Sequence, residues 1–372
     1  MIRIEDKSKC CGCEACAQVC TTNCISMKRD EEGFLYPEID TGKCIDCGFC
    51  ELVCPFNKDV IINPLIEAQK CKAKNKIDRD KSSNGGAFSC LARKIIGDGG
   101  VVFGVRMSED CKESFLCKAE NEDELEYLLG SKYVQGRVNT AYIEAESEIK
   151  SGRRVLFSGT PCQINGLKLY LRQDYDNLYC VDVVCHGVPS PSLWKRYAEY
   201  VENKNRSNLK SVQFKFWDEA QKSYGIKGEL ENGKTVFKSE NYDLYMQLFK
   251  RNISLRPSCY NCQSKDLRLS DITLGEFIDD NIDRKDSLVF VRTQKGQELL
   301  ESVKDNLKSE IIPIEKAIND YSNANDEVKI IPQRASFFGD LAELNFSEIE
   351  KKYIYTDSKS KIKKHFHTLF KK

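Results

Sequence analysis

Cysteines near the N-terminus fall into two runs that share one spacing, C-x2-C-x2-C-x3-C. The first run consists of Cys10, Cys13, Cys16 and Cys20. The second run consists of Cys44, Cys47, Cys50 and Cys54. Pro55 follows the second run, whereas Thr21 stands at that place in the first. In this spacing three thiolates of one turning loop reach three irons of a [4Fe-4S] cubane, and the fourth thiolate reaches the neighbouring cluster.

The spacing therefore predicts two [4Fe-4S] clusters with crossed ligands. One cluster is assigned to Cys10, Cys13, Cys16 and Cys54. The other is assigned to Cys44, Cys47, Cys50 and Cys20. A zinc site is the alternative, but zinc motifs usually pair two short C-x2-C units and do not string four cysteines so tightly. We expect a two-cluster ferredoxin module, in which Thr21 is harmless because proline is not a ligand.

The overall composition is that of an ordinary globular protein. The chain has 372 residues, 41% apolar and 31% charged, which is enough for two or three domains with their own cores. Lys+Arg and Asp+Glu both number 57, so no bulk charge favours nucleic acid or a membrane. We expect no transmembrane segment and no signal peptide. With 19 cysteines, the chain is expected to use metal or redox chemistry in the cytoplasm of a host that lives with little oxygen.

Composition and periodicity divide the chain into four segments. Residues 1–62 form the ferredoxin module, with a small hairpin around Gly33. Residues 63–152 and 153–345 form the two parts of a larger body, with a polar linker at 70–81. Residues 346–372 form a basic tail, which we expect to be an amphipathic terminal helix, docking on an anionic membrane or a partner being the alternative. The apolar residues of that helix are Ile362, Phe366, Leu369 and Phe370.

Helical and strand patterns alternate along the larger body. Helices are expected at 87–96, 123–129, 140–149 and 194–201, and strands at 101–105 and 178–184. A buried strand at 154–159 leads into a helix whose first position suits Pro161. Alternation at 212–216 and 234–237 predicts antiparallel strands around Asn232-Gly233. The predicted fold class is an α+β ferredoxin-like dicluster module followed by a mixed α/β core with an antiparallel strand-rich insertion.

Four further cysteines lie where such a core gathers ligands. Cys162 and Cys185 follow the ends of two predicted strands, the edge at which open α/β sheets bind ligands. Cys259 and Cys262 form a lone C-x2-C, which zinc or a redox pair would explain equally well. The four thiolates are enough for a third cluster if the fold brings them together.

Five blocks of sequence occur in a characteristic order. They are Ser83–Phe88, Gly130–Gln135, Leu156–Ile164, Val184–Pro191 and Leu255–Cys262. Together they resemble the coenzyme F420 hydrogenase/dehydrogenase beta-subunit family, in its version with an N-terminal ferredoxin module. The likeness extends over nearly the whole chain. It departs from the family at Ser270–Asp279, which replaces the usual Asp-Phe-Trp-Gly ending, so the pocket wall there is expected to differ.

The resemblance implies that the α/β core binds FAD and holds a third [4Fe-4S] cluster near the flavin. Carried over by position, the ligands of this cluster would be Cys162, Cys185, Cys259 and Cys262. Clusters pass one electron at a time, whereas a flavin can also exchange two electrons as a hydride with an organic substrate. The expected device is therefore a converter between one-electron and two-electron transfer.

Two turns at helix starts are the expected contacts of the FAD. The first turn consists of Ser83, Asn84, Gly85 and Gly86. Its glycine pair allows the backbone to approach a pyrophosphate, with N–H groups pointing at the phosphates. The second turn offers another anion site and consists of Ser158, Gly159 and Thr160.

Three polar side chains each have two candidate roles. Lys132 is expected as a cation beside the pyrimidine edge of the flavin, where it would stabilise the reduced anionic ring; a solvated lysine is the alternative. His186 is either a proton donor during substrate reduction or a hydrogen-bonding neighbour of the third cluster. Arg256 pairs either with a phosphate or acidic substrate group or within a structural ion pair.

The remaining cysteines are expected to be structural. Cys24 falls where ferredoxins carry small apolar residues, and Cys11 abuts a ligand but is out of register. The others are expected as small buried or surface thiols. They are Cys71, Cys90, Cys111, Cys117 and Cys180.

These observations favour an oxidoreductase that passes electrons between ferredoxin-type clusters and FAD, with hydride exchange to coenzyme F420 or another small organic substrate. An electron-relay subunit of a larger complex is the second hypothesis, and an iron–sulfur sensor is the third. The flavin-related blocks argue against the sensor. The expected partners are a ferredoxin or another redox protein and a small molecule, in a homo-oligomer or a complex, without nucleic acid.

Overall fold

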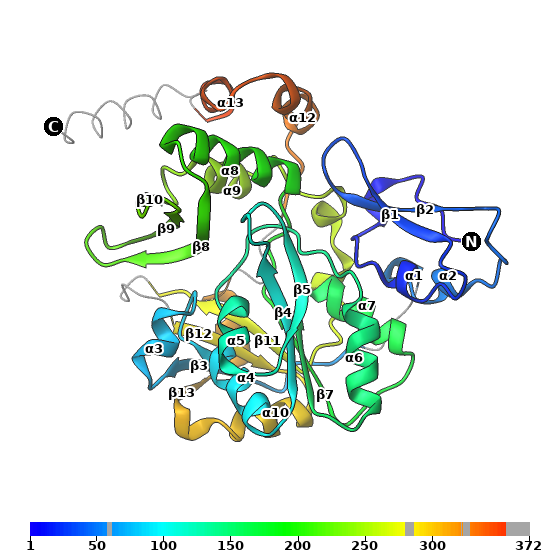
Figure 1. Ribbon diagram of the computed structural model, residues 1–372. Helices are drawn as coiled ribbons and strands as arrows, with labels where there is room; N and C mark the ends of the chain where they lie inside the picture. Colours follow the sequence, from blue (N-terminus) through cyan, green and yellow to red (C-terminus); the bar gives the residue numbers. More distant parts are fainter. Residues whose placement is uncertain (58–61, 280–285, 321, 323–327, 355–372) are drawn as a thin grey trace.

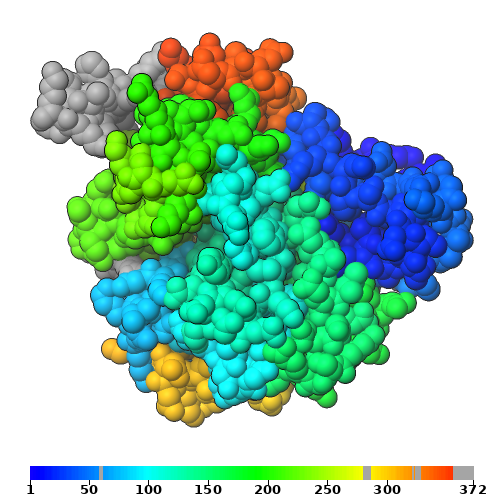
Figure 2. All heavy atoms as spheres, viewed as in Figure 1, coloured from blue at the N-terminus to red at the C-terminus, as the bar shows by residue number. Residues whose placement is uncertain are grey.

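The computed structural model describes residues 1–57, 62–279, 286–320, 322 and 328–354. Figure 1 shows an N-terminal module at one side of a larger α/β body, with helices covering the top of that body. In Figure 2 the module forms a separate lobe that lies against the flank of the body. The expected division into a small module and a mixed α/β core is confirmed.

The module contains one hairpin and two short helices. Strands β1 (Ile25–Arg29) and β2 (Leu35–Ile39) pair antiparallel, as the sequence predicted. Each cysteine loop turns into a one-turn helix, α1 (Ala15–Gln18) or α2 (Phe49–Leu52). The residue before each helix has a left-handed backbone, with φ of 61° before α1 and 77° before α2. The turn lies between the second and third cysteines of each run, and the helix that follows it leads on to the last cysteine.

The larger body is built on one mixed sheet of eight strands. In spatial order they are β13 (Leu307–Ile312), β3 (Glu67–Ala73), β12 (Asp286–Val291), β11 (Ile272–Phe277), β7 (Leu178–Val183), β6 (Val155–Gly159), β4 (Val101–Met107) and β5 (Ser114–Ala119). The four strands from β11 to β4 run parallel, so their carboxyl ends meet at one edge. Antiparallel strands complete the sheet on both sides.

Both faces of this sheet are buried, because successive residues of the central strands point to opposite cores. Val102 and Leu156 pack with α4 (Ala87–Gly97), α5 (Glu122–Leu128) and α10 (Gln294–Glu301). Phe103 and Phe157 stack at 5.5 Å on the other face, beneath α6 (Ala141–Lys150) and α7 (Pro161–Leu171). Such two-sided burial is typical of parallel strands covered by helices. The helices and strands predicted between residues 87 and 201 are confirmed, and most of them begin and end within three residues of the predicted bounds. The helix predicted at 194–201 is longer and spans Pro191–Asn205.

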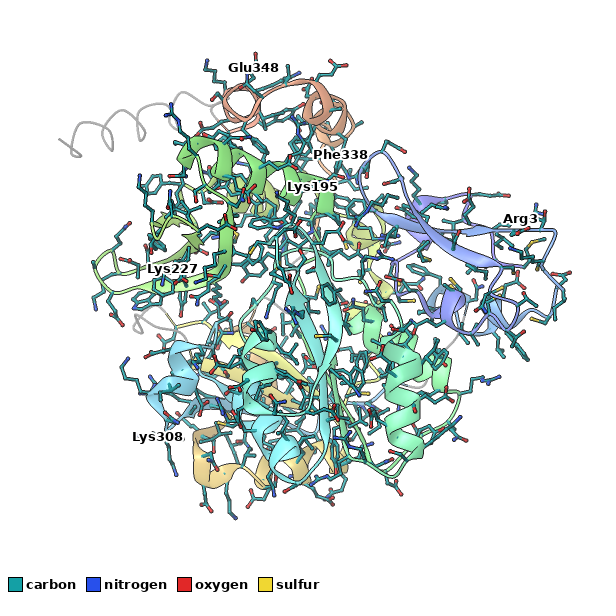
Figure 3. The ribbon with its side chains drawn as sticks, viewed as in Figure 1. Arg3, Lys195, Lys227, Lys308, Phe338 and Glu348 are labelled. Atoms are coloured by element: carbon teal, nitrogen blue, oxygen red, sulfur yellow. The ribbon has the colours of Figure 1, made fainter. Side chains whose placement is uncertain are left out.

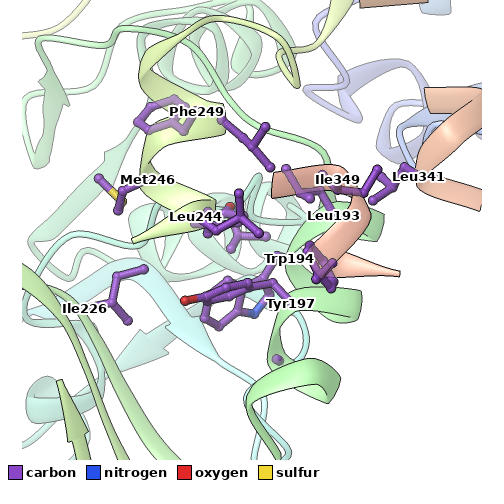
Figure 4. Packing of buried hydrophobic residues seen from close by; sticks show 14 of the residues in the cluster. Leu193, Trp194, Tyr197, Ile226, Leu244, Met246, Phe249, Leu341 and Ile349 are labelled. Carbon is purple, nitrogen blue, oxygen red and sulfur yellow. The ribbon is translucent and has the colours of Figure 1, made fainter. Parts of the chain in front are cut away.

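A second sheet and a helical layer complete the body. The sheet contains β8 (Leu209–Asp218), β9 (Ser223–Leu230) and β10 (Thr235–Ser239). The helical layer contains α8 (Pro191–Asn205), α9 (Leu244–Lys250), α12 (Arg334–Glu343) and α13 (Phe346–Tyr353). Figure 4 shows its core, in which Trp194 and Tyr197 lie among leucines and isoleucines of the neighbouring helices. The short remaining helices are α3 (Lys76–Asp80) and α11 (Ile314–Asn319).

One expectation about these segments is wrong and another is incomplete. The proposed linker at 70–81 contains most of β3, whose inward residues are the small Ala68, Cys71 and Ala73 and therefore give a faint apolar signal. Strands are present at both predicted runs, as β8 and β10, but the Asn232-Gly233 turn joins β10 to a third strand, β9. The sequence pattern missed β9 because glycines interrupt its alternation. At Gly225 a Cβ would lie 2.3 Å from the carbonyl oxygen of Lys238, so that glycine allows close strand approach.

The predicted terminal helix with Ile362 and Phe366 lies outside the described residues. In the described part of the chain, no helix combines the length and the apolar character that crossing a membrane requires.

The turn before α4 gives a test of the packing. A Cβ on Gly85 would lie 2.3 Å from the carbonyl oxygen of Cys71 and 2.6 Å from the backbone nitrogen of Ser287. We expect Gly85→Ala to cost about 2–4 kcal/mol of unfolding free energy, because β3 and β12 must move apart. The control is Gly97→Ala, where a Cβ meets no atom within 4 Å. It should be neutral or stabilise by up to about 1 kcal/mol. Equal unfolding midpoints for the two variants would contradict this packing.

Candidate functional site

The thiols assigned to the first cluster come together at the boundary between module and body. Cys16 lies close enough to the thiols of Cys10 and Cys54 to interact with them, and Cys13 interacts with Cys16 and Cys54. Burial, followed by the thiols of Cys10 and Cys54, raises the pKa of Cys16. The crossed partner Cys54 therefore reaches the first loop, as the spacing required. We call these four residues the first group.

The thiols assigned to the second cluster line one pocket at the outer end of the module. The pocket has a volume of about 350 Å³ and is lined by Cys20, Cys44, Cys47 and Cys50. Cys24 is buried, as expected, but its sulfur also borders the pocket, 3.4 Å from that of Cys20. Cys47 is exposed, and so is the neighbouring Ile45. This second group therefore lies near the surface.

The four strand-end and loop cysteines also converge, which the sequence alone left open. Cys185, just after β7, interacts with the thiols of Cys162, Cys259 and Cys262. Cys162 lies in the first turn of α7, and Cys259 lies in the 3-10 helix Pro257–Asn261. Figure 3 shows sulfur atoms, in yellow, within the module and also beyond it in the body. We call these four cysteines the third group.

Backbone pairing explains why the third group assembles. The N–H of Ser190 donates to the carbonyl of Ser254 at 2.8 Å, and the N–H of Arg256 donates to Val188 at 3.0 Å. These bonds bring the loop after β7 to the Cys259 loop. On the other side, Asn165 of α7 donates to the carbonyl of Leu267 at 2.6 Å.

The surroundings of the third group fit a thiolate-bound cluster. The N–H of Val188 lies 3.4 Å from the sulfur of Cys259, and the hydroxyl of Thr160 lies 3.2 Å from that of Cys162. Hydrogen bonds to sulfur are among the means by which proteins adjust cluster potentials. Among the described residues, no three His, Cys, Asp or Glu side chains are placed to hold one metal ion. The fit therefore rests on the four converging thiols and on these donors to two of their sulfurs.

The first and third groups are neighbours. The thiol of Cys11 lies close enough to those of Cys13 and Cys162 to interact with both, and so stands between the two groups. Gly166 of α7 makes room for this approach, because a Cβ there would lie 2.9 Å from the Cβ of Cys13. Gln135 fixes the loop by donating to the carbonyl of Cys11 at 2.9 Å. The groups therefore follow one another from the exposed Cys47 inward to the sheet edge.

The role of Cys11 in this junction was missed, because its position in the motif is out of register with the ligands. The other structural cysteines lie as expected. Cys71, Cys90, Cys111 and Cys180 are buried in the apolar cores, and Cys117 is half-buried.

The first predicted flavin turn lies at the same sheet edge and gathers polar side chains. Asn84 accepts a hydrogen bond from Lys215 at 2.7 Å, and Lys215 also pairs with Glu276 and lies 5.0 Å from the ring centre of Tyr224. Ser83 accepts the N–H of Ser131 at 2.6 Å. Lys215 and Tyr224 carry no motif, so sequence reasoning missed them, whereas Glu276 lies in Ser270–Asp279, where the pocket wall was expected to differ from the family.

The N-terminus of α4 follows directly from this turn. Gly86 has a φ of 91° and supplies no side-chain cap, so the first helical N–H groups have few side-chain partners. The N–H of Ala87 lies 3.4 Å from the hydroxyl of Ser287. Uncapped N–H groups, hydroxyls and a lysine form a donor set that fits a phosphate or pyrophosphate.

The second predicted turn has a different environment. The Oε1 of Gln163 accepts a hydrogen bond from the N–H of Thr160 at 3.0 Å, and its Nε2 donates to the carbonyl of Gly136 at 2.9 Å. The N-terminus of α7 is therefore capped by its own residues, and its nearest reactive neighbour is Cys162. Ser158 and Gly159 end the adjoining strand β6.

Lys132 and His186 both have well-defined partners. Lys132 donates to the carbonyls of Tyr127 and Leu129, at 2.9 and 2.7 Å, at the end of α5. Burial lowers the pKa of Lys132 to about 7. His186 lies beside Cys185, and its Nε2 is 2.6 Å from the Oδ1 of Asn252. These contacts hold one side chain at a helix end and the other next to the third group.

Comparison with known protein families divides the chain in the same way. Residues 152–317 match the family described as the C terminus of the coenzyme F420 hydrogenase/dehydrogenase beta subunit. Residues 9–58 match the 4Fe-4S dicluster domain. Eight of the assigned cysteines therefore lie in one matched region, and the third group lies in the other.

Individual relatives match different shares of the chain. A coenzyme F420-dependent sulfite reductase of Methanocaldococcus jannaschii is 22% identical over 315 residues, covering 81% of this chain and 47% of the reductase. The chain thus spans about half the length of that relative. An uncharacterized ferredoxin of the same archaeon is 36% identical over 73 residues, 20% of this chain and 92% of the ferredoxin. A chain in the F420-reducing [NiFe] hydrogenase complex from Methanosarcina barkeri has a TM-score of 0.47 and 16% identity, covering 73% of this chain and 91% of that one.

Two cysteine variants separate ligands from neighbours. Cys162→Ser should lower the iron content of anaerobically purified protein from about twelve to about eight atoms per chain, because the third group loses a thiolate. Cys11→Ala is the matched control in the same junction and should keep about twelve. Iron and sulfide analysis measures both. Undiminished iron in Cys162→Ser, or a loss of about four atoms in Cys11→Ala, would show that the ligand set is wrong.

Proposed function

We propose that the chain is an FAD-containing oxidoreductase connected to a redox partner by three clusters, because residues 152–317 match the family described as the C terminus of the coenzyme F420 hydrogenase/dehydrogenase beta subunit and residues 9–58 match the 4Fe-4S dicluster domain. The observation that carries this proposal is the series of three thiol groups. It begins at the exposed Cys47, passes the largely buried first group, and ends with Cys162 at the carboxyl edge of the large sheet.

The proposed flavin site is the edge of the sheet next to the third group. The turn Ser83–Gly86, the uncapped start of α4 and Lys215 would bind the diphosphate, and Ser158–Thr160 would border the site on the side of Cys162. Bound FAD would supply the exchange between single electrons and a hydride. The residues of the chain would hold the cofactor and keep the third group close to it.

The contacts of Lys132 and His186 refine their proposed roles. Both lysines have partners, Lys132 the carbonyl groups at the end of α5 and Lys215 the Glu276 carboxylate. Of the two, Lys215 donates to a residue of the predicted flavin turn, Asn84, and is therefore the better candidate for the cation beside the cofactor. His186 is held by Asn252 beside Cys185, so we assign it a positioning role near the third group in place of proton donation.

The proposed substrate is a hydride carrier, with coenzyme F420 as the first candidate. The support is the family match and the name of the reductase, which this chain covers by about half its length. We propose that this chain performs the F420-linked half of such a reaction. Electrons would leave through the second group to a ferredoxin or another one-electron partner, and the direction would reverse when that partner is reduced.

The deciding experiment uses the full chain purified without oxygen. We expect about twelve irons and one FAD per chain, and bleaching of the FAD absorbance when reduced F420 is added. The Cys162→Ser variant should still bleach but should reduce an external one-electron acceptor more slowly. Clusters and FAD without any response to F420 would instead support another organic substrate or a relay subunit. Protein without FAD would refute the enzyme proposal.

A lysine pair tests the placement of the cofactor. Lys215→Met should weaken FAD binding about tenfold or more, because it removes a charged donor from the Asn84 turn. Lys132→Met should leave FAD binding unchanged, because its ammonium bonds the end of α5. FAD titration followed by fluorescence quenching measures both dissociation constants. The reverse order of effects would move the cofactor toward Lys132.

A further inference from the structure

Arg256 is the largest charged side chain that the structure buries completely, with 0% of its surface exposed. It projects from the Cys259 loop into the module. Its Nε donates to the carbonyl of Cys10 at 2.7 Å, and its Nη2 donates to the carbonyl of Leu35 at 2.8 Å. Nη1 lies 3.2 Å from the Oε1 of Gln135. One side chain of the body is therefore bonded to both the first cysteine loop and the hairpin.

The positive charge of Arg256 has sulfur atoms among its neighbours. Nη2 lies 3.5 Å from the sulfur of Cys10, and the thiols of Cys11 and Cys259 also interact with the guanidinium. In the described part of the chain no carboxylate forms an ion pair with it. Glu14 lies within electrostatic range of Arg256, but its carboxylate accepts a hydrogen bond from the N–H of Val138 at 2.8 Å. A buried cation without an anionic partner is costly, so the arrangement calls for negative charge at these sulfurs.

The module is shaped around this guanidinium. The ring centre of Tyr36 lies 4.4 Å and that of Phe34 lies 5.4 Å from its central carbon. Gly12, between two cysteines of the first loop, has a φ of 69°, and a Cβ there would lie 2.8 Å from Nη1 of Arg256. The first loop can therefore take its path past Arg256 only with glycine at this position.

We propose that Arg256 is a positioning residue that sets the reduction potential of the first cluster and, to a smaller extent, of the third. Reduction of a cluster adds one electron and breaks no bond. A fixed cation in a site of low dielectric constant stabilises the added negative charge and raises the potential. Arg256 thus adjusts the two clusters on either side of the module–body boundary together. This inference rests on the clusters of the proposed function.

The chain offers a matched control for loosening the boundary. Arg334 also ties the hairpin to the body, bonding Glu32 at 2.7 and 2.5 Å and the carbonyl of Leu255 at 2.8 Å. Its charge is paired with the Glu32 carboxylate. Arg334→Gln therefore weakens the same boundary without removing a charge from beside a thiolate.

The experiment is an anaerobic redox titration of the full chain, followed by electron paramagnetic resonance, after its iron has been counted. For Arg256→Gln we expect the ratio of reduced to oxidised first cluster, at one fixed solution potential, to fall at least tenfold. That fall corresponds to a midpoint lower by about 59 mV or more. Gln135→Glu should act in the same direction, because it places an anion against the guanidinium while Arg256 stays. Arg256→Lys and Arg334→Gln should change the ratio less than threefold.

The outcomes separate this inference from the proposed function. Full clusters with unchanged potentials in Arg256→Gln and Gln135→Glu would overturn the inference and leave the proposed function standing. An equal shift in Arg334→Gln would also overturn it, because loosening of the boundary would then explain the effect. If Arg256→Gln does not retain its clusters, Gln135→Glu decides. Wild-type protein without clusters would refute the proposed function itself.

Discussion

The close approach of the first cysteine loop to helix α7 is the contact on which the rest of the molecule depends. Gly166 leaves space for Cys13, and the thiols of Cys11 and Cys162 interact across the boundary. Hydrogen bonds from the body, such as the Val138 N–H to Glu14 and the Tyr142 N–H to Gln18, fix the loop in register. Without this contact the module would be a ferredoxin attached to an unrelated domain. With it, the three thiol groups form one series.

This boundary combines polar pairs with an apolar cluster that runs across it, in which Ala15 and Val53 of the module lie with Tyr142 and Ile164 of the body. Arg29 pairs with Glu113 at 2.6 Å, and Glu32 pairs with Arg334. Polar contacts of this kind depend on direction, so they determine one orientation and not only association. An orientation held in this way is what a series of electron carriers needs, because their order and separation decide whether electrons pass.

Residues whose spacing is set by cluster chemistry were easier to predict from the sequence than residues that only tertiary packing brings together. Cysteine spacing predicted the crossed groups, because cluster geometry dictates that spacing. The helices and strands from 87 to 201 followed from strong apolar periods, whereas β3 was missed because its inward residues are alanines and a cysteine. Lys215 and Cys11 could not be found, since each acquires its neighbours only through contacts far apart in the chain. For Arg256 the sequence left two roles open, and its bonds to Cys10 and Leu35 match neither fully.

The exposed position of Cys47 determines where oxygen damages the protein first. Its side chain is exposed and the apolar Ile45 beside it is 66% exposed, whereas Cys13, Cys16 and Cys54 are buried. Dioxygen would reach a cluster held by the second group first, and oxidative damage would then proceed toward the first and third groups. A briefly aerated sample would then keep its inner metal and its colour while being cut off from the proposed one-electron partner. Electron transfer to the partner would therefore be lost before the inner cofactors are.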